Sequence, residues 1–131
     1  MVTIAEIEQV QEAVRDVYID EILQRWVVDL VRATRDLDAV AIGASVRGSL
    51  ALERAVRAWA LIQGRDYAVP DDVLDLFLPV IGHRVVFTPA FLVEARKLGW
   101  VRTMEELRRR CLELAPRPEA EPAEVLPIAG A

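Results

Sequence analysis

Apolar side chains recur every three or four residues along most of this chain. That spacing places them on one face of an α-helix, whereas the alternation typical of a half-buried strand is nearly absent. The segments with the helical pattern are residues 4–17, 22–31, 52–62, 73–81 and 104–114. The pattern predicts an all-α fold, a small bundle of about five or six helices in which short loops favour antiparallel neighbours.

Polar residues at the helix starts define several boundaries. Residues 3–6 and 103–106 read Thr-x-x-Glu, the capping-box pattern in which the two side chains satisfy backbone donors reciprocally. Asp20 is placed to cap the second helix, which is expected to end near Arg35. We expect the first and last helices to bury one face each. Those faces are Ile4, Ile7, Val10, Val14 and Val17 in the first helix and Met104, Leu107, Cys111 and Leu114 in the last.

The central helix is predicted to run from about residue 46 to residue 63. Ser45 precedes it as an N-cap whose hydroxyl can accept a backbone N–H, and Gly64 follows as a C-cap. Glu53 and Arg57 stand four residues apart, the favourable order for an ion pair on a helix surface. The expected buried side consists of Leu52, Ala55, Val56, Trp59 and Ile62.

The segments on either side of the central helix are shorter. Residues 36–43 are expected to form a loop that leads into it. A fourth helix begins at Pro70, with two carboxylates behind the proline, and ends before Gly82. Residues 84–87 are expected to be extended, and residues 88–98 form another helix between a Thr-Pro start and a glycine stop.

Length and composition indicate one domain with a tail. A chain of 131 residues with 53% apolar residues can bury a single core. We assign residues 1–115 to the helical domain. Residues 116–131 are rich in Pro, Ala and Glu and lack periodicity, so we expect them to be disordered.

Charge and hydropathy exclude several classes of function. The net charge is −5, so the protein repels a phosphate backbone and nucleic-acid binding is not expected. No apolar run approaches the roughly 20 residues that a membrane span needs. The N-terminus lacks the basic start of a secretory signal, and we therefore expect a cytoplasmic protein.

The sequence offers no metal site. It contains one cysteine, Cys111, and one histidine, His83, without the paired spacing of zinc ligands. Cys111 falls on the apolar stripe of the last helix, so we interpret it as a small core residue rather than a reactive thiol. His83 and Arg84 suit a structural or inter-subunit contact better than catalysis, because no nucleophile accompanies them.

The start of the central helix carries an unusual pair of residues. Arg47 stands where the helix dipole is already positive, and Gly48 costs about 1 kcal/mol relative to alanine inside a helix. Two unfavourable residues in one helical turn are consistent with a turn that presents the Arg47 cation to an anion. Free backbone N–H groups and a guanidinium together form a site suited to phosphate.

Residues 43–73 also resemble a known family. They read GASVRGSLALERAVRAWALIQGRDYAVPDDV, which is similar to the C-terminal lid of MoxR-type AAA+ ATPases, where GASPRA and an alanine-rich helix precede GRDYVTPDDV. Residues 82–86 continue the match with a His-Arg pair, and residues 13–19 and 30–35 resemble the first two lid helices. Two departures, Val46 for proline and Val69 for Thr or Ser, leave the proposed chemistry untouched.

The resemblance implies a role for four residues. Arg47 occupies the sensor-2 position, the lid arginine that reaches the γ-phosphate of ATP, and Ser45 lies beside it. Tyr18 and Ile19 stand near the junction where lids of this superfamily cover the adenine. The resemblance also implies ATP with Mg²⁺ in a longer parent protein, whose AAA+ core this lid would contact. Further implied partners are neighbouring subunits of a ring and a client protein that the sequence does not identify.

What the chain lacks limits its activity. A working AAA+ subunit needs a glycine-rich loop ending in Gly-Lys-Ser/Thr, and the one lysine here, Lys97, lies between Arg96 and Leu98. We therefore expect no ATPase activity from this chain alone and interpret it as an excised lid or the end of a longer ATPase.

An alternative interpretation has no nucleotide role. A long central helix, the Gly-Arg-Asp-Tyr turn and a proline-capped helix also fit a helical interaction or dimerisation module of histone-fold type. The two hypotheses differ on Arg47, which is important in a lid and replaceable in a dimerisation module. For a lid, Arg47 acts on the nucleotide of its own subunit or of the next one, and the sequence does not decide between these.

Overall fold

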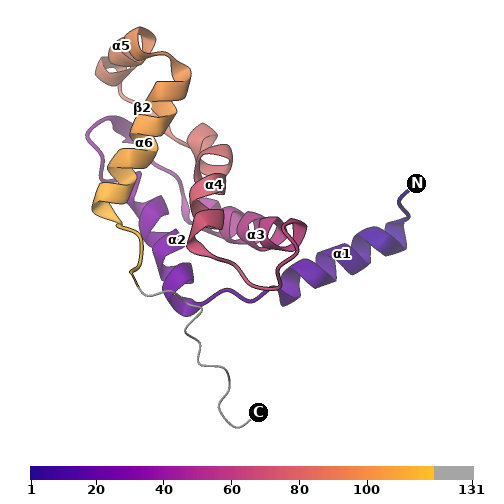
Figure 1. The fold of residues 1–131 in the computed structure, drawn as a ribbon. Coiled ribbons are helices and arrows are strands. Elements are labelled where there is room, and N and C mark those ends of the chain that lie inside the picture. The colour runs from indigo at the N-terminus through magenta and orange to yellow at the C-terminus, as the bar shows by residue number, and fades with distance from the viewer. Residues whose placement is uncertain (120–131) are drawn as a thin grey trace.

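The computed structural model describes residues 1–119, and these form six α-helices, one 3₁₀ helix and a two-stranded ribbon (Figure 1). The elements are α1 (Ile4–Asp16), α2 (Glu21–Ala33), β1 (Val40–Ile42), α3 (Val46–Ile62), α4 (Pro70–Ile81), η1 (Gly82–Arg84), β2 (Val86–Phe87), α5 (Pro89–Leu98) and α6 (Trp100–Leu114). The predicted helical bundle is confirmed. Of the predicted tail, residues 120–131 lie outside the described residues.

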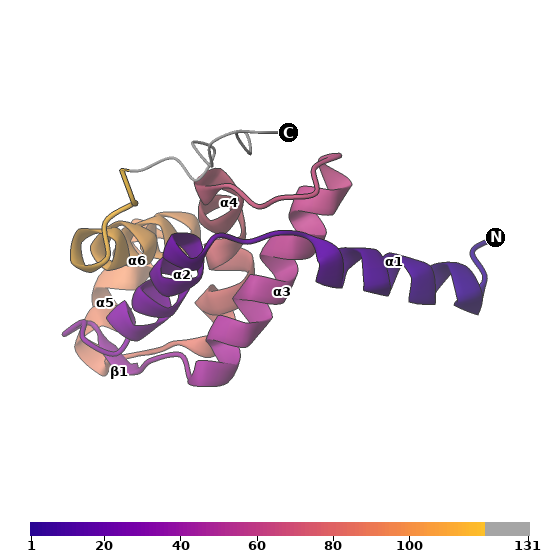
Figure 2. The same cartoon turned by 90° about the horizontal axis from the view of Figure 1, so that it is seen from below.

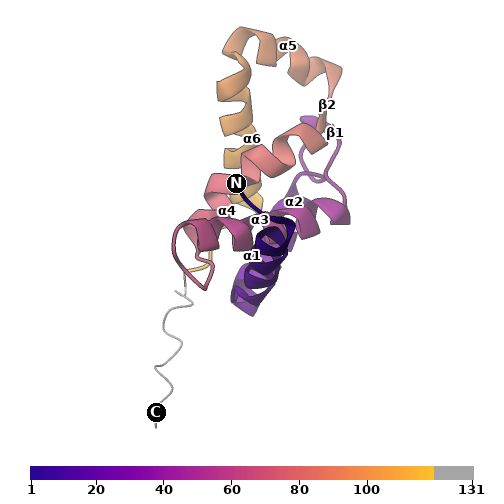
Figure 3. The same ribbon diagram turned by 90° about the vertical axis from the view of Figure 1, so that its right-hand side faces the viewer.

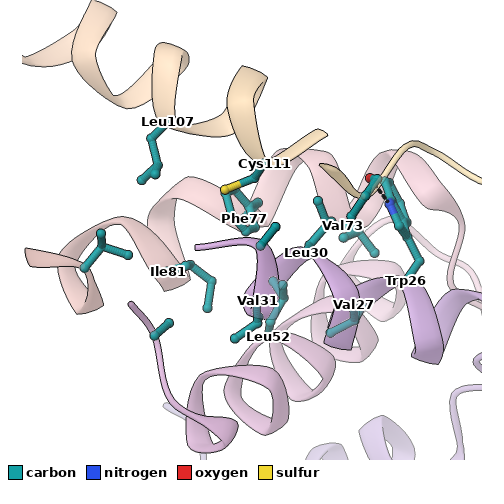
Figure 4. Close-up of a cluster of buried hydrophobic side chains, with 14 of the residues drawn as sticks. Trp26, Val27, Leu30, Val31, Leu52, Val73, Phe77, Ile81, Leu107 and Cys111 are labelled. Carbon is teal, nitrogen blue, oxygen red and sulfur yellow. Dashed lines mark hydrogen bonds between the residues drawn. The ribbon is translucent and has the colours of Figure 1, made fainter. Parts of the chain in front are cut away.

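The core lies where α2, α3, α4 and α6 meet (Figure 4). Each helix contributes fully buried apolar side chains: Leu30 from α2, Leu52 from α3, Phe77 from α4 and Leu107 from α6. Trp26 extends the core to the end of α6, because its indole N–H donates to the Ala115 carbonyl at 2.9 Å. The remaining buried apolar residues lie around these contacts and join the helices into one unit.

Helix α1 differs from the prediction. Its capping box is present, with the Glu6 amide 3.2 Å from the Thr3 hydroxyl. The expected buried face is wrong for the helix itself, because none of its residues is buried. Only Val17, the residue just after the helix, is buried as expected. The helix extends away from the rest of the domain and touches α3 near its C-terminal end (Figures 1 and 2). There Arg57 of α3 donates to the carbonyls of Arg15 and Val17 at 3.2 and 2.5 Å.

The predicted loop before α3 contains a short strand. β1 pairs antiparallel with β2, with Val40 opposite Phe87, and the Thr88 amide continues the pairing by donating to the Ala39 carbonyl at 2.9 Å. A strand of three residues is too short to show the alternation of apolar and polar side chains by which a strand is recognised in a sequence. The pairing ties the segment before α3 to the segment after α4.

The start of α6 also differs from the prediction. The helix begins at Trp100, so Thr103 lies inside it and donates its hydroxyl to the Gly99 carbonyl at 2.8 Å instead of capping. Glu106 pairs with Arg109 and Arg110, which lowers its pKa to about 2 through their hydrogen bonds.

Outside α1, two further positions expected to be buried are exposed. Leu114 is 55% exposed at the end of α6, and Ile62 is 73% exposed at the end of α3. Both lie in the last turn of their helices, where the neighbouring helices no longer cover the apolar stripe. Within residues 1–119, no helix is long and apolar enough to cross a membrane.

A partly buried ion pair fixes the turn between α3 and α4. Arg65 follows Gly64, which has the left-handed φ of +80° that favours glycine. The Arg65 guanidinium contacts both carboxylate oxygens of Asp72, at 2.5 and 2.8 Å, and Asp72 also accepts the Val69 amide at 2.8 Å. The hydrogen bond to Asp72 raises the pKa of Arg65, and the ion pair ties the turn to the start of α4.

We predict that Asp72→Asn lowers the free energy of unfolding by about 3 kcal/mol, because it leaves a guanidinium without its buried counter-charge. Urea denaturation measures the change. Asp75→Asn is the matched control, since Asp75 is an exposed acid on the same helix. Equal stability of the two variants would show that the ion pair contributes nothing.

We also predict that Cys111 does not react in the folded protein. Its side chain is fully buried, and burial raises the pKa of the thiol to about 12, so little thiolate exists near pH 8. Ellman's reagent should label Cys111 only after denaturation. Stoichiometric labelling of the native protein would contradict its place in the core.

Candidate functional site

The first turn of α3 presents open hydrogen-bond donors. Ser45 occupies the N-cap position with extended backbone angles, φ −83° and ψ 174°, but its side chain makes no capping bond. The prediction that its hydroxyl caps the helix is therefore wrong. The first N–H groups of a helix have no acceptor one turn earlier in the helix. The Gly48 amide donates to the Ser45 carbonyl at 2.8 Å, whereas the amides of Val46 and Arg47 have no acceptor within residues 1–119.

Arg47 lies in this turn with its side chain exposed. Within residues 1–119 its guanidinium makes no hydrogen bond and no ion pair, in contrast to Arg57 and Arg65. A permanently charged guanidinium whose N–H donors are all unbonded is suited to bidentate hydrogen bonding with the oxygens of an anion.

The segment before Arg47 is anchored to the end of α2. The Thr34 hydroxyl is fully buried, donates to the Val31 carbonyl at 2.6 Å and accepts the Ala44 amide at 2.9 Å. Arg35 donates from Nε to the Ala44 carbonyl at 2.9 Å. Both backbone groups of Ala44 are thus held by consecutive residues of one helix end.

Close packing at Gly43 completes this contact. A Cβ at Gly43 would lie 2.5 Å from the Arg35 Cγ and 2.8 Å from its backbone N and Cα. No side chain fits there without moving the backbone of Arg35, two residues after α2 ends. We refer to Thr34, Arg35, Gly43 and Ala44 as the α2–α3 anchor.

Close packing accounts for the glycine at position 48. This corrects the hypothesis that Gly48 is present because the turn presents a cation to an anion. Gly48 is buried, and a Cβ there would lie 3.3 Å from the Ile81 Cδ1 and 3.4 Å from the Ala44 Cβ. The missing side chain lets the first turn of α3 approach the end of α4.

Two further arginines lie near the start of α3. The Arg84 Cδ is 3.8 Å from the Cβ position of Gly48, while its Nε donates to the Val80 carbonyl at 3.0 Å. Arg35 packs against Gly43. Together with Arg47 they form a local concentration of positive charge in a chain of net charge −5. The sequence analysis missed this grouping, because these residues come from three separate segments.

Tyr18 and Ile19 lie elsewhere on the domain. Tyr18 pairs with the segment after α3, donating its amide to the Asp66 carbonyl and accepting the Ala68 amide, both at 2.8 Å. The Tyr18 side chain is 54% exposed, whereas Ile19 is 6% exposed and belongs to the core.

The structure does not bring these two residues next to Arg47. The neighbouring Val17 carbonyl accepts from Arg57, ten residues after Arg47 on α3, which corresponds to about 15 Å along the helix. The predicted adenine and phosphate contacts therefore form two separate regions. His83 is exposed in η1, and residues 1–119 contain no cluster of side chains that could hold a metal ion.

Comparison with known proteins assigns the family. The AAA lid domain matches residues 32–98, just over half of the chain. This chain belongs to the AAA lid domain family. The match spans the α2–α3 anchor, Arg47 and Arg84, and it ends before α6.

Curated relatives support a connection with MoxR proteins. The chain is 38% identical over 79 residues to the uncharacterized protein YeaC of Bacillus subtilis, covering 60% of this chain and 25% of YeaC. It is 37% identical over 89 residues to the chaperone MoxR1 of Mycobacterium tuberculosis, covering 61% of this chain and 24% of MoxR1. The chain thus spans about a quarter of the length of these relatives, and the predicted MoxR-related AAA lid is confirmed.

A solved structure has the same fold. The crystal structure of a proposed ATPase from Cytophaga hutchinsonii superposes with a TM-score of 0.68, covering 81% of this chain and 34% of that one. The two sequences are 24% identical in this alignment, so the likeness concerns the fold alone.

We predict that Gly43→Ala destabilises the domain by about 1–3 kcal/mol, since the added methyl group meets the backbone of Arg35. Ser45→Ala is the control two residues away and should cost less than about 0.5 kcal/mol, because no capping bond is lost. Urea midpoints measure both. The anchor would be contradicted if Gly43→Ala unfolded at the wild-type midpoint.

Proposed function

We propose that this domain covers ATP bound to a separate AAA+ core and that Arg47 contacts the γ-phosphate. The observation that carries the proposal is an exposed guanidinium, without a partner in residues 1–119, on an anchored helix start. The Val46 and Arg47 amides of that turn have no acceptor in the same residues. Family membership supports an ATP context in the longer protein.

The donor set suits a triphosphate. Arg47 supplies a bidentate charged donor, the start of α3 supplies backbone N–H groups and a positive dipole end, and the exposed Ser45 hydroxyl lies beside them. ATP with Mg²⁺ bound by the core would bring the negative charge that these groups lack. Arg47 then stabilises phosphate charge, and the bond-breaking machinery belongs to the core.

The rest of the nucleotide would contact another part of the lid. Tyr18 presents an exposed ring suitable for covering adenine, and buried Ile19 supports the backbone beside it. Arg47 acts either on that nucleotide or on the nucleotide of a neighbouring subunit, and both arrangements fit two separate contact regions.

The anchor gives Arg47 a mechanical role. ATP and ADP differ by one phosphate, so Arg47 binds the two states with different free energy and thereby shifts the position of the lid. Because Ala44 is hydrogen-bonded to Thr34 and packed near Gly48, a displacement of Arg47 is transmitted to α2 and α4. In a cytoplasmic ring this would couple the nucleotide state to remodelling of a client protein.

We predict that Arg47→Ala lowers kcat for ATP hydrolysis about a hundredfold when this lid is joined to its AAA+ core. That loss corresponds to about 2.7 kcal/mol of transition-state stabilisation. Arg54→Ala is the matched control, because Arg54 is another exposed arginine of α3 and should keep wild-type turnover. Steady-state phosphate release measures both variants.

Unchanged turnover in Arg47→Ala, with the fold intact by circular dichroism, would overturn the sensor role. The helical interaction module without a nucleotide role would then be the better account. The isolated chain should bind ATP weakly and hydrolyse none, since one arginine and a helix end are a small part of a nucleotide site.

A further inference from the structure

Two apolar surfaces of this domain have no partner within residues 1–119. The first is the outer part of α1, where Ile4, Ile7 and Val10 are 78%, 47% and 56% exposed. Exposed apolar residues scattered singly are normal, but a contiguous stripe on one helix marks an interaction site. We call this stripe the α1 face.

The second surface lies where α5 meets α6. Val93, Leu98, Trp100 and Val101 are 58%, 44%, 63% and 70% exposed on either side of Gly99, whose φ of +83° makes the sharp connection. Tryptophan and its aliphatic neighbours are typical of interface centres. We call this surface the α5–α6 corner.

The two surfaces carry opposite charge. Helix α1 contains four carboxylates and one guanidinium, a net charge of −3, and Glu8 and Glu12 are exposed without an ion pair in the described part of the chain. Residues 93–102 contain three basic side chains and one acid, a net charge of +2. The basic residues Arg96, Lys97 and Arg102 are exposed and likewise make no ion pair with residues 1–119.

The two surfaces cannot meet within one molecule. Helix α1 extends from the side of α3, while the α5–α6 corner lies at a different end of the domain in both Figure 1 and Figure 3. Pairing of α1 with another α1 would bring two helices of charge −3 together, which electrostatic complementarity disfavours. The α5–α6 corner is apolar and bordered by basic side chains, so its charge is complementary to that of the acidic α1 face.

We propose that the α1 face of one copy of this chain docks on the α5–α6 corner of a second copy. The contact is head-to-tail, so every added copy leaves one of each surface open, and repetition gives a ring or an open chain. The proposal concerns how copies pack beside one another and does not depend on what Arg47 binds. Because the surfaces are small, the association belongs to the weak class and requires high protein concentration.

Charge-matched variants test the pairing. Ile7→Arg places a cation on the α1 face opposite the basic corner, and Trp100→Glu places an anion in the corner opposite the acidic helix. Both positions are exposed, so the fold should persist. Leu114→Arg is the control, because Leu114 is 55% exposed on α6 at the end away from the corner.

Sedimentation of the full chain at increasing concentration measures association. We expect the wild type and Leu114→Arg to associate progressively, and each of the two surface variants alone to lose at least tenfold in association constant. An equimolar mixture of Ile7→Arg and Trp100→Glu should regain association as a heterodimer, because each variant retains the surface that the other lacks. Added salt should weaken this dimer.

Several outcomes would overturn the proposal. A wild-type chain that stays monomeric up to about 1 mM has no such contact, since that concentration corresponds to only about 4 kcal/mol of binding. Self-association of Trp100→Glu as strong as that of the wild type would indicate like-with-like pairing through α1. A mixture that stays monomeric, although the wild type associates, would show that the two surfaces do not bind each other.

Discussion

The buried hydroxyl of Thr34 joins the end of α2 to the segment that leads into α3. The Thr34 side chain donates to the carbonyl of Val31 on its own helix and accepts the amide of Ala44 in the segment before α3. A buried amide left without an acceptor costs about 1–3 kcal/mol, so this bond strongly disfavours separation of the segment from α2. The position of Arg47, three residues later, and the approach of α3 to α4 at Gly48 both follow from it.

The domain is rigid where it surrounds this bond and open where it meets other molecules. Leu30, Leu52 and Phe77 are buried in the core, whereas Arg47, the α1 face and the α5–α6 corner lie on the outside. Function in this domain therefore depends on surfaces that a stable core positions but does not cover. The positive charge around the start of α3 is concentrated against an acidic background, which favours one anionic partner at one place.

Much of the fold could be predicted from local signals. Glycine and proline define both ends of α4 and the end of α5, and the capping residues Thr3, Asp20 and Thr88 begin their helices as expected. Burial was less predictable. The period of α1 shows that one face is apolar, but it contains no information on whether the partner of that face lies within the same chain. The Thr-x-x-Glu pattern at residue 103 wrongly predicted a helix start, because α6 begins three residues earlier, at Trp100.

The candidate site was predicted only in part. Arg47 stood out from its own turn and from the family pattern, and its exposure agrees with a binding role. The approach of Arg84 to Gly48 and the contact of Arg35 with Gly43 depend on tertiary packing, which no spacing in the sequence reports. The same holds for Gly48. A glycine is needed there because Ile81 packs against it, and not because a ligand binds.

The central claim is that the anchor holds the start of α3 as firmly as the core. Native-state hydrogen exchange of the Ala44 amide tests this most directly, because that amide lies in a connecting segment and is protected solely by Thr34. The account predicts exchange through an opening whose free energy approaches that of global unfolding. Exchange as fast as that of an exposed loop amide would contradict it, since Arg47 would then stand on a flexible segment and could not transmit force to α2 and α4.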